Sequence, residues 1–64
     1  MLVATIQIKM DENRINTYIL VQDDNEIVNA KNPKFTMPGT ENDFKTFLKR
    51  LEECVGARVT LQKF

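Results

Sequence analysis

Two stretches of alternating apolar and polar residues, 2–10 and 14–22, constrain this chain more than any other feature of its sequence. Alternation with a period of two, rich in β-branched residues, is typical of strands that are buried on one face. Asp11, Glu12 and Asn13 separate the two stretches. Because an aspartate can accept a hydrogen bond from a backbone amide two residues further along, these residues favour a tight turn. The pattern therefore predicts a β-hairpin.

A turn of similar composition, Asp-Asn-rich residues 23–25, follows the second stretch. Asparagine tolerates the left-handed backbone conformation that short hairpin loops require, so residues 26–31 are expected to form a third, shorter strand of a meander. Two prolines in residues 32–39 forbid a central strand there, and this segment is expected to run as an edge or a loop. Its Phe35 and Met37 are candidates to plug one end of the core.

The clearest helical pattern covers residues 41–55. Thr40 and Asp43 have the spacing of a capping box, and Gly56 supplies the left-handed residue that ends many helices. Residues 57–63 alternate again and predict a last strand. Apolar residues at helical spacing form a single stripe expected to face the sheet: Phe44, Phe47, Leu48, Leu51 and Val55.

The lengths of these elements favour one topology. A helix over 41–55 spans about 22 Å, and strands of seven or eight residues span about 23–27 Å, so the helix crosses the sheet once. The last strand is then expected to run parallel to the first and third, and a right-handed crossover places it beside the first. The prediction is one two-layer α+β domain over residues 1–64, in which a mixed four-stranded sheet (β-β-β-α-β, order 3-2-1-4) carries one helix on one face.

The residue types present disfavour catalysis. The 64 residues include one cysteine and no histidine, so neither an internal disulfide nor a structural zinc site is expected, and no cofactor is predicted. Cys54 lies near the expected helix C-terminus, where the macrodipole disfavours a thiolate, and is predicted at the margin of the core. The carboxylates at the turns are expected to be solvated, with a weak divalent-cation site at residues 23–26 as the alternative. We therefore expect a protein without enzymatic activity.

The start of the chain and its size bear on location and association. The N-terminus lacks a basic region, and Thr5 and Gln7 interrupt its apolar residues, so neither a signal peptide nor a membrane span is expected. The lone thiol suits a reducing cytoplasm. A domain of this size buries only about 60% of its unfolded surface, and such domains often gain stability from a partner subunit.

The second face of the predicted sheet suggests a function. One face is expected to receive the helix and carries Leu2, Ala4, Ile6, Ile8, Ile15, Ile19, Val21, Val59 and Leu61. The open face should be polar if it only met water, yet its apolar patch is predicted to consist of Val3, Thr5, Tyr18, Leu20 and Val28, or Ile27 in the other register. An apolar patch with a polar rim resembles an interface. The leading prediction is a protein-interaction module of the adaptor or inhibitor type that binds a partner or forms a homodimer through this face, with Tyr18 and Leu20 as anchors. The simpler alternatives are that a small protein exposes a few apolar residues, or that Phe35 covers them.

A small nucleic-acid-binding domain is the alternative function. The first 32 residues contain three basic and five acidic side chains, whereas the second half contains six and four. The candidate phosphate contacts are Lys45, Lys49, Arg50, Arg58 and Lys63, with Lys31 and Lys34 in the proline-containing segment. Glutamates interrupt the basic residues of the helix at ordinary i, i+4 pair spacing, which is also typical of a solvated helix face.

Overall fold

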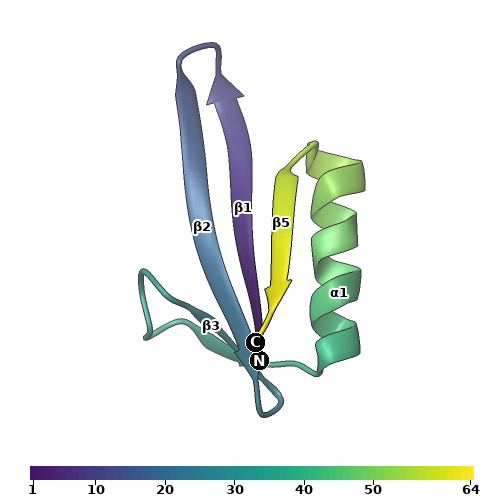
Figure 1. The fold of residues 1–64 in the computed structure, drawn as a ribbon. Coiled ribbons are helices and arrows are strands. Elements are labelled where there is room, and N and C mark those ends of the chain that lie inside the picture. Colours follow the sequence, from purple (N-terminus) through teal and green to yellow (C-terminus); the bar gives the residue numbers. More distant parts are fainter.

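The protein folds into one antiparallel sheet of five strands and one helix in a computed structural model that describes residues 1–64 (Figure 1). Along the chain the elements are β1 (Leu2–Asp11), β2 (Arg14–Asp23), β3 (Glu26–Asn29), β4 (Thr36–Pro38), α1 (Glu41–Arg50), the π-helical turn η1 (Leu51–Val55) and β5 (Arg58–Lys63). The strand order is β4-β3-β2-β1-β5. The predicted α+β fold with one sheet and one helix is confirmed, whereas the four-stranded mixed sheet in order 3-2-1-4 is wrong.

The short strand β4 accounts for both differences. It pairs with β3 at the edge of the sheet, where the missing N–H of Pro38 is tolerated. β4 reverses the chain once more before α1, so the helix returns the chain in the direction that makes β5 antiparallel to β1. Three residues are too few for an alternating pattern to be visible in the sequence, which is why this reversal was not predicted.

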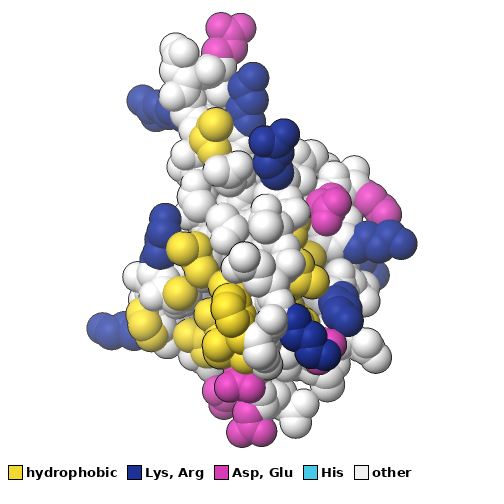
Figure 2. Space-filling view, viewed as in Figure 1, with side chains coloured by type: hydrophobic (Ala, Val, Ile, Leu, Met, Phe, Trp, Pro, Cys, Tyr) yellow, Lys and Arg dark blue, Asp and Glu magenta, His cyan; other side chains and the backbone are white.

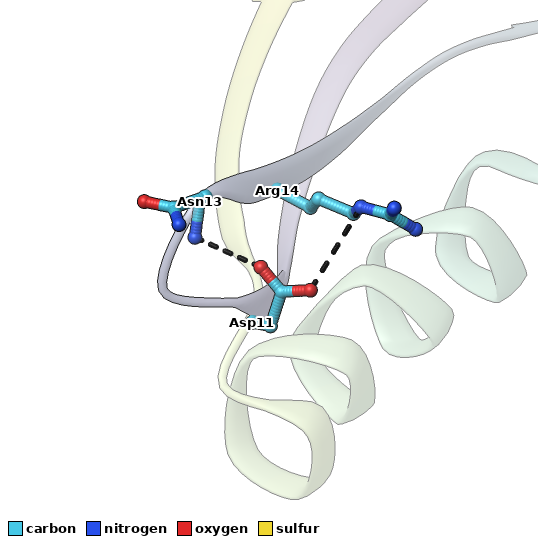
Figure 3. A network of polar contacts seen from close by, with 3 residues as sticks. All are labelled: Asp11, Asn13 and Arg14. Atoms are coloured by element: carbon cyan, nitrogen blue, oxygen red, sulfur yellow. Dashed lines mark hydrogen bonds and ion pairs between the residues drawn. The ribbon is translucent and has the colours of Figure 1, made fainter.

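The turn between β1 and β2 has the predicted chemistry (Figure 3). The backbone N–H of Asn13 donates to Asp11 Oδ1 at 2.8 Å, and Arg14 Nε lies 3.9 Å from Asp11 Oδ2. Next to this turn, the strand pairing shifts between Lys9 and Asp11 and leaves Met10 without a partner on β2. This one-residue irregularity is a β-bulge.

The bulge decides which face of β2 meets the helix. If pairing continued regularly from the turn, Ile6 would lie opposite Ile19, and the predicted faces would be correct. Instead Ile6 lies opposite Tyr18. Because a shift of one residue moves every side chain of a strand to the other face, the predicted open-face positions of Tyr18 and Leu20 are wrong: both lie on the helix side. The residues that turn away from the helix instead are Ile15, Ile19 and Val21.

The second hairpin turn and the helix start agree with the sequence prediction. Asp24 and Asn25 both adopt positive φ, as a two-residue hairpin loop requires. At the helix, Thr40 Oγ1 accepts from Asp43 N at 3.2 Å, and Asp43 Oδ2 accepts from Thr40 N at 3.0 Å. These two reciprocal bonds are the predicted capping box. Gly56 ends the helix at φ 72°, also as predicted.

The end of the helix departs from the predicted stripe. Its last five residues form η1, in which the wider i→i+5 bonding rotates side chains away from their α-helical positions. As a result Val55 and Cys54 are exposed rather than packed against the sheet. Cys54 therefore does not lie at the margin of the core.

The core lies mainly between α1 and β1. Phe44 and Ile6 are its largest fully buried side chains. One polar side chain, Gln22, is buried with them and donates from Nε2 to the carbonyl oxygen of Gly39 at 3.3 Å. The complete set of buried apolar residues is Leu2, Ala4, Ile6, Ile27, Phe44, Leu48 and Ala57.

The long hairpin of β1 and β2 extends beyond the rest of the sheet (Figure 1). β5 pairs only with residues 2–7 of β1, and β3 pairs only with residues 20–23 of β2. The remainder of the hairpin forms a two-stranded arm, on which Met10 and Ile15 are exposed. None of the helical structure has the length and apolar character needed to cross a membrane.

Candidate functional site

An apolar cleft opens on the helix side of the sheet, because α1 covers only part of that face. In Figure 1 the helix lies along β5, at the opposite side of the sheet from β3. The uncovered part of the face forms a cleft of about 450 Å³, and nine of its eleven lining residues are hydrophobic. This volume lies within the range of sites that bind ligands or side chains of partners.

The bulge determines which residues of β2 form the floor of the cleft. Tyr18 and Leu20 of β2 lie beside Ile6 and Ile8 of β1, and Ile27 of β3 continues this surface toward the sheet edge. Tyr18 and Leu20 are the two that a regular hairpin would have turned away from the helix. The shift in register therefore transfers the aromatic ring of β2 from the open face to the cleft.

One wall of the cleft comes from the helix. Phe47 and Leu51 line it, one helical turn apart. On the predicted stripe both were expected to be core residues, but only Phe44 and Leu48, on the side nearer β1, are buried. Phe47 lies at the margin of the stripe and remains 37% exposed.

The other wall is formed by the end of the segment between β3 and β4 and by β4 itself. The N–H of Phe35 donates to Asn32 O at 3.0 Å, and its carbonyl oxygen accepts from Asn29 N at 3.2 Å. These bonds fix the backbone of Phe35, whose ring is nonetheless 69% exposed, next to Met37 at 48%. The two side chains thus form a wall rather than the predicted plug of the core, and they lie on the helix side rather than over the open face.

Three aromatic residues at the cleft are partly exposed. Tyr18 is 38% exposed, so that with Phe35 and Phe47 three rings are only partly covered. With about 200 Å² for each aromatic side chain, these fractions leave on the order of 300 Å² in contact with water. Contiguous apolar patches of this size on monomers are often functional.

The predicted partner-binding residues are divided between two surfaces. Val3, Thr5 and Val28 lie on the open face, where Val21 is paired with both valines to form a short apolar row. All four side chains are half-buried by their neighbours on the sheet. Tyr18, the predicted aromatic anchor, and Leu20 are in the cleft instead, and the open face carries Ile15, Ile19 and Val21 in their place.

The predicted phosphate-binding residues do not share one surface. On β5, Arg58 pairs with Gln7 and lies on the open face, whereas Lys63 pairs with Leu2 and lies on the helix side. On the helix, Lys45 Nζ is 3.1 Å from Glu41 Oε1. The hydrogen bond and charge of this lysine hold the pKa of the Glu41 carboxyl below its usual range.

The carboxylates outside the cleft include one that caps the helix, and none belongs to a metal-holding cluster. The Asp43 carboxyl takes part in the capping box. The hydrogen bond from the backbone N–H of Thr40 is the main cause that lowers the pKa of this carboxyl, and the Thr40 side chain lowers it further. No three Cys, Asp or Glu side chains are grouped so that they could hold a metal ion, residues 23–26 included. Figure 2 shows hydrophobic side chains gathered in the lower part of the view, near β3, with basic side chains to either side and acidic ones below.

Comparison of the chain with protein-family models, with characterised proteins and with solved structures found no match.

Proposed function

We propose that this protein is a non-enzymatic protein-interaction module that receives a partner protein in the cleft between α1 and the β3–β4 segment. The observation that carries the proposal is the exposure of Phe35, Met37, Tyr18 and Phe47 around one concave surface. Aromatic side chains and methionine are enriched at interfaces, and they dominate binding energies when they fill a pocket at the centre of a contact.

The magnitude of the available energy supports this function. At about 25 cal/mol per Å², burial of all of the roughly 300 Å² that the three aromatic residues expose would contribute about 7 kcal/mol, which is an upper bound because only part of this surface faces the cleft. Association itself costs about 4–15 kcal/mol, so the cleft can serve as the central contact of an interface that also includes its rim. The same surface left in water would favour aggregation, which gives a second physical reason to expect that a partner covers it.

Nucleic-acid binding has weaker support. Phosphate backbones are bound by several cations on one surface, and the five candidate cations are spread over the helix and both faces of the sheet. Salt-dependent binding of a random oligonucleotide at low ionic strength would restore this alternative.

Site-specific photocrosslinking in the cells that make the protein tests the proposed function. A photoreactive phenylalanine analogue replaces Phe35 in the cleft, and in a matched control it replaces Thr60, which is exposed on the open face. We expect a discrete protein adduct from position 35 and none from position 60. A second copy of the chain as the adduct would identify the partner as a homodimer.

Two outcomes would contradict the proposal. An adduct of equal yield from position 60 would place the interface on the open face, and the absence of any protein adduct from position 35 would show that the cleft has no partner. The captured protein must also bind the purified wild-type chain and lose affinity for Phe35→Ser, because capture alone does not show that the cleft is the contact.

A further inference from the structure

The long hairpin of β1 and β2 leaves one strand edge without a neighbour. We propose that two copies of this chain associate through the outer edge of β2, residues 14–18, which pair antiparallel across a two-fold axis and join the two sheets into one. This inference goes beyond the proposed function, because it concerns the backbone edge of β2 rather than the side chains that line the cleft. It depends on the two-stranded arm, on the backbone groups that point outward from β2, and on the charges at the two ends of this edge.

The arm that projects from the sheet has only two strands (Figure 1). β5 ends its pairing with β1 at Gln7, and β3 ends its pairing with β2 at Leu20. Two-stranded hairpins are marginally stable in water, whereas three or more strands that carry a hydrophobic face are stable. Ile15 is 62% exposed on this arm and Met10 is 59% exposed. A further strand beside β2 would supply the missing neighbour and cover part of this apolar surface.

The backbone of β2 presents unpaired hydrogen-bonding groups along this edge. The carbonyl oxygen of Ile19 accepts from Ala30 N at 2.8 Å on the outer side of the strand. Because alternate residues of an antiparallel strand bond to the same neighbour, Thr17 and Ile15 direct their N–H and C=O groups to this side as well. No backbone group pairs with them there. The carbonyl oxygen of Thr17 instead accepts from Lys31 Nζ at 2.9 Å, an exposed bond that a pairing strand would replace.

The other edges of the sheet are less suited to self-association. β4 is three residues long and ends at Pro38. The outer edge of β1 on the arm is interrupted by the bulge at Met10, and bulges protect strand edges. β5 carries Arg58 and Lys63 and no acidic residue, so two copies paired along it would bring like charges together. Residues 14–18 are therefore the favoured edge.

The charges at the two ends of this edge are complementary. The strand begins after the acidic residues Asp11 and Glu12 of the turn, and Lys31 lies beside its other end, at Thr17. Two-fold antiparallel pairing places the turn of each copy next to Lys31 of the other. Asp11 already lies 3.9 Å from Arg14 (Figure 3), but neither Glu12 nor Lys31 takes part in an ion pair within one chain. A second copy of the chain therefore supplies the opposite charge for both.

Sedimentation equilibrium of the purified wild-type chain tests this association. An edge of five residues forms few hydrogen bonds, so we expect a dissociation constant on the order of 0.1 mM. Between about 10 µM and 1 mM, the measured mass should rise from near 7.4 kDa toward twice this value. A monomer mass over the whole range would overturn the inference. So would a mass above that of a dimer, because two-fold pairing uses up the edge.

Proline substitutions on two strands locate the contact. Thr17→Pro removes an N–H that points outward, and proline is tolerated at such edge positions. This variant should associate at least tenfold more weakly. The matched control is Leu61→Pro: Phe64 N donates to Met1 O, so the N–H of Leu61, three residues earlier, points outward from β5. The control should dimerise as the wild type does, and an unchanged dissociation constant for Thr17→Pro would contradict pairing at β2.

Hydrogen exchange of the wild type examines the same edge without any substitution. The amides of Ile15 and Thr17 should exchange about threefold more slowly at about 1 mM than at about 0.05 mM, as a dissociation constant near 0.1 mM requires. The amide of Leu61 should exchange at the same rate at both concentrations. Equal rates for Ile15 and Thr17 at both concentrations would refute the proposed pairing, whether or not the proline variants fold.

Charge reversal tests the antiparallel arrangement. Glu12→Lys and Lys31→Glu should each weaken association about fivefold, and the double variant should recover wild-type association. Failure of the double variant to recover would overturn the two-fold placement of turn and lysine.

The cleft variant Phe35→Ser separates this inference from the proposed function, because its ring lines the cleft, and it should leave the dimer unchanged. A dimer lost in Phe35→Ser but retained in Thr17→Pro would place self-association in the cleft, which would overturn this inference and retain the proposed function. A monomeric wild type would overturn this inference alone, and photocrosslinking at position 35 would still decide the function of the cleft.

Discussion

Truncation of three phenylalanines to alanine should give three different losses of stability, because the structure exposes their rings to different extents. Phe44 is fully buried, Phe47 is 37% exposed and Phe35 is 69% exposed. Replacement of a buried phenylalanine by alanine costs about 3–5 kcal/mol. Scaled by the covered fraction of each ring, the expected losses are about 4 kcal/mol for Phe44→Ala, about 2–3 kcal/mol for Phe47→Ala and about 1 kcal/mol for Phe35→Ala.

These losses can be compared with the total stability expected for the chain. At 0.05–0.15 kcal/mol per residue, a protein of 64 residues has an unfolding free energy of about 3–10 kcal/mol. Phe44→Ala should therefore be largely unfolded near the lower end of this range, whereas Phe35→Ala should remain folded throughout it.

Urea unfolding, followed by far-ultraviolet circular dichroism, gives the free energy of unfolding of the wild type and of the three variants. The losses of stability can be compared if all four proteins have the same m-value. Losses in the order Phe44, Phe47, Phe35 are the expected result. If Phe35→Ala is as damaging as Phe44→Ala, the ring is buried in solution and the cleft is closed. Such a result would refute the open cleft described here.

Further substitutions test the local structure around the cleft. Gly39→Ala should lower the free energy of unfolding in urea by about 1–3 kcal/mol. An added Cβ would lie 2.5 Å from Ile27 Cδ1, so the buried Ile27 side chain would have to shift. Thr40→Ala should cost about 0.5–2 kcal/mol through loss of the helix N-cap, again measured by urea unfolding. The pKa of Asp43 is lowered in the folded state, so the ionised carboxylate stabilises the fold above its unfolded pKa, and this contribution is lost as the pH falls below about 4. The melting temperature of Asp43→Asn should therefore decrease less at acid pH than that of the wild type. Deletion of Met10 should leave the fold intact by circular dichroism, because removal of the bulged residue restores regular pairing without a change of register elsewhere.

Local features of the sequence were sufficient to predict the helix and its ends. The capping box of Thr40 and Asp43 and the left-handed Gly56 each depend on residues within one turn of one another, so the sequence pattern contains the whole interaction. The same holds for the hydrogen bond from Asn13 to Asp11 in the first turn. Features of this kind need no knowledge of the tertiary structure.

The faces of the hairpin could not be predicted in the same way. Alternation shows which residues of β2 share a face, but it does not show which face lies beside Ile6, and the bulge at Met10 reverses the answer. Both faces of β2 are apolar, so hydrophobicity alone did not select one. The prediction therefore placed Tyr18 and Leu20 on the open face, whereas the structure places both on the helix side.

The walls of the cleft were missed for a different reason. Phe47 belongs to the apolar stripe of the helix, and the spacing of this stripe shows only that its residues share one side. It does not show that the helix covers only part of the sheet and leaves Phe47 at the cleft. Phe35 lies in an irregular segment and Met37 in the three-residue strand β4, which is too short for periodicity to indicate a direction for its side chains. An aromatic residue and a methionine beside two prolines, outside any visible pattern, were the only sequence signal that this part of the chain lines the cleft.

Nuclear Overhauser contacts of the Tyr18 ring test the central claim of this account most directly, namely that the bulged register places this ring in a cleft beside the helix. Residues directly opposite on neighbouring strands have Cβ atoms about 4.5–5.5 Å apart, well within the range of the effect. The account predicts contacts from the Tyr18 ring to the methyl groups of Ile6. Contacts to Gln7, and none to Ile6, would show regular pairing and would contradict the cleft and the function proposed for it.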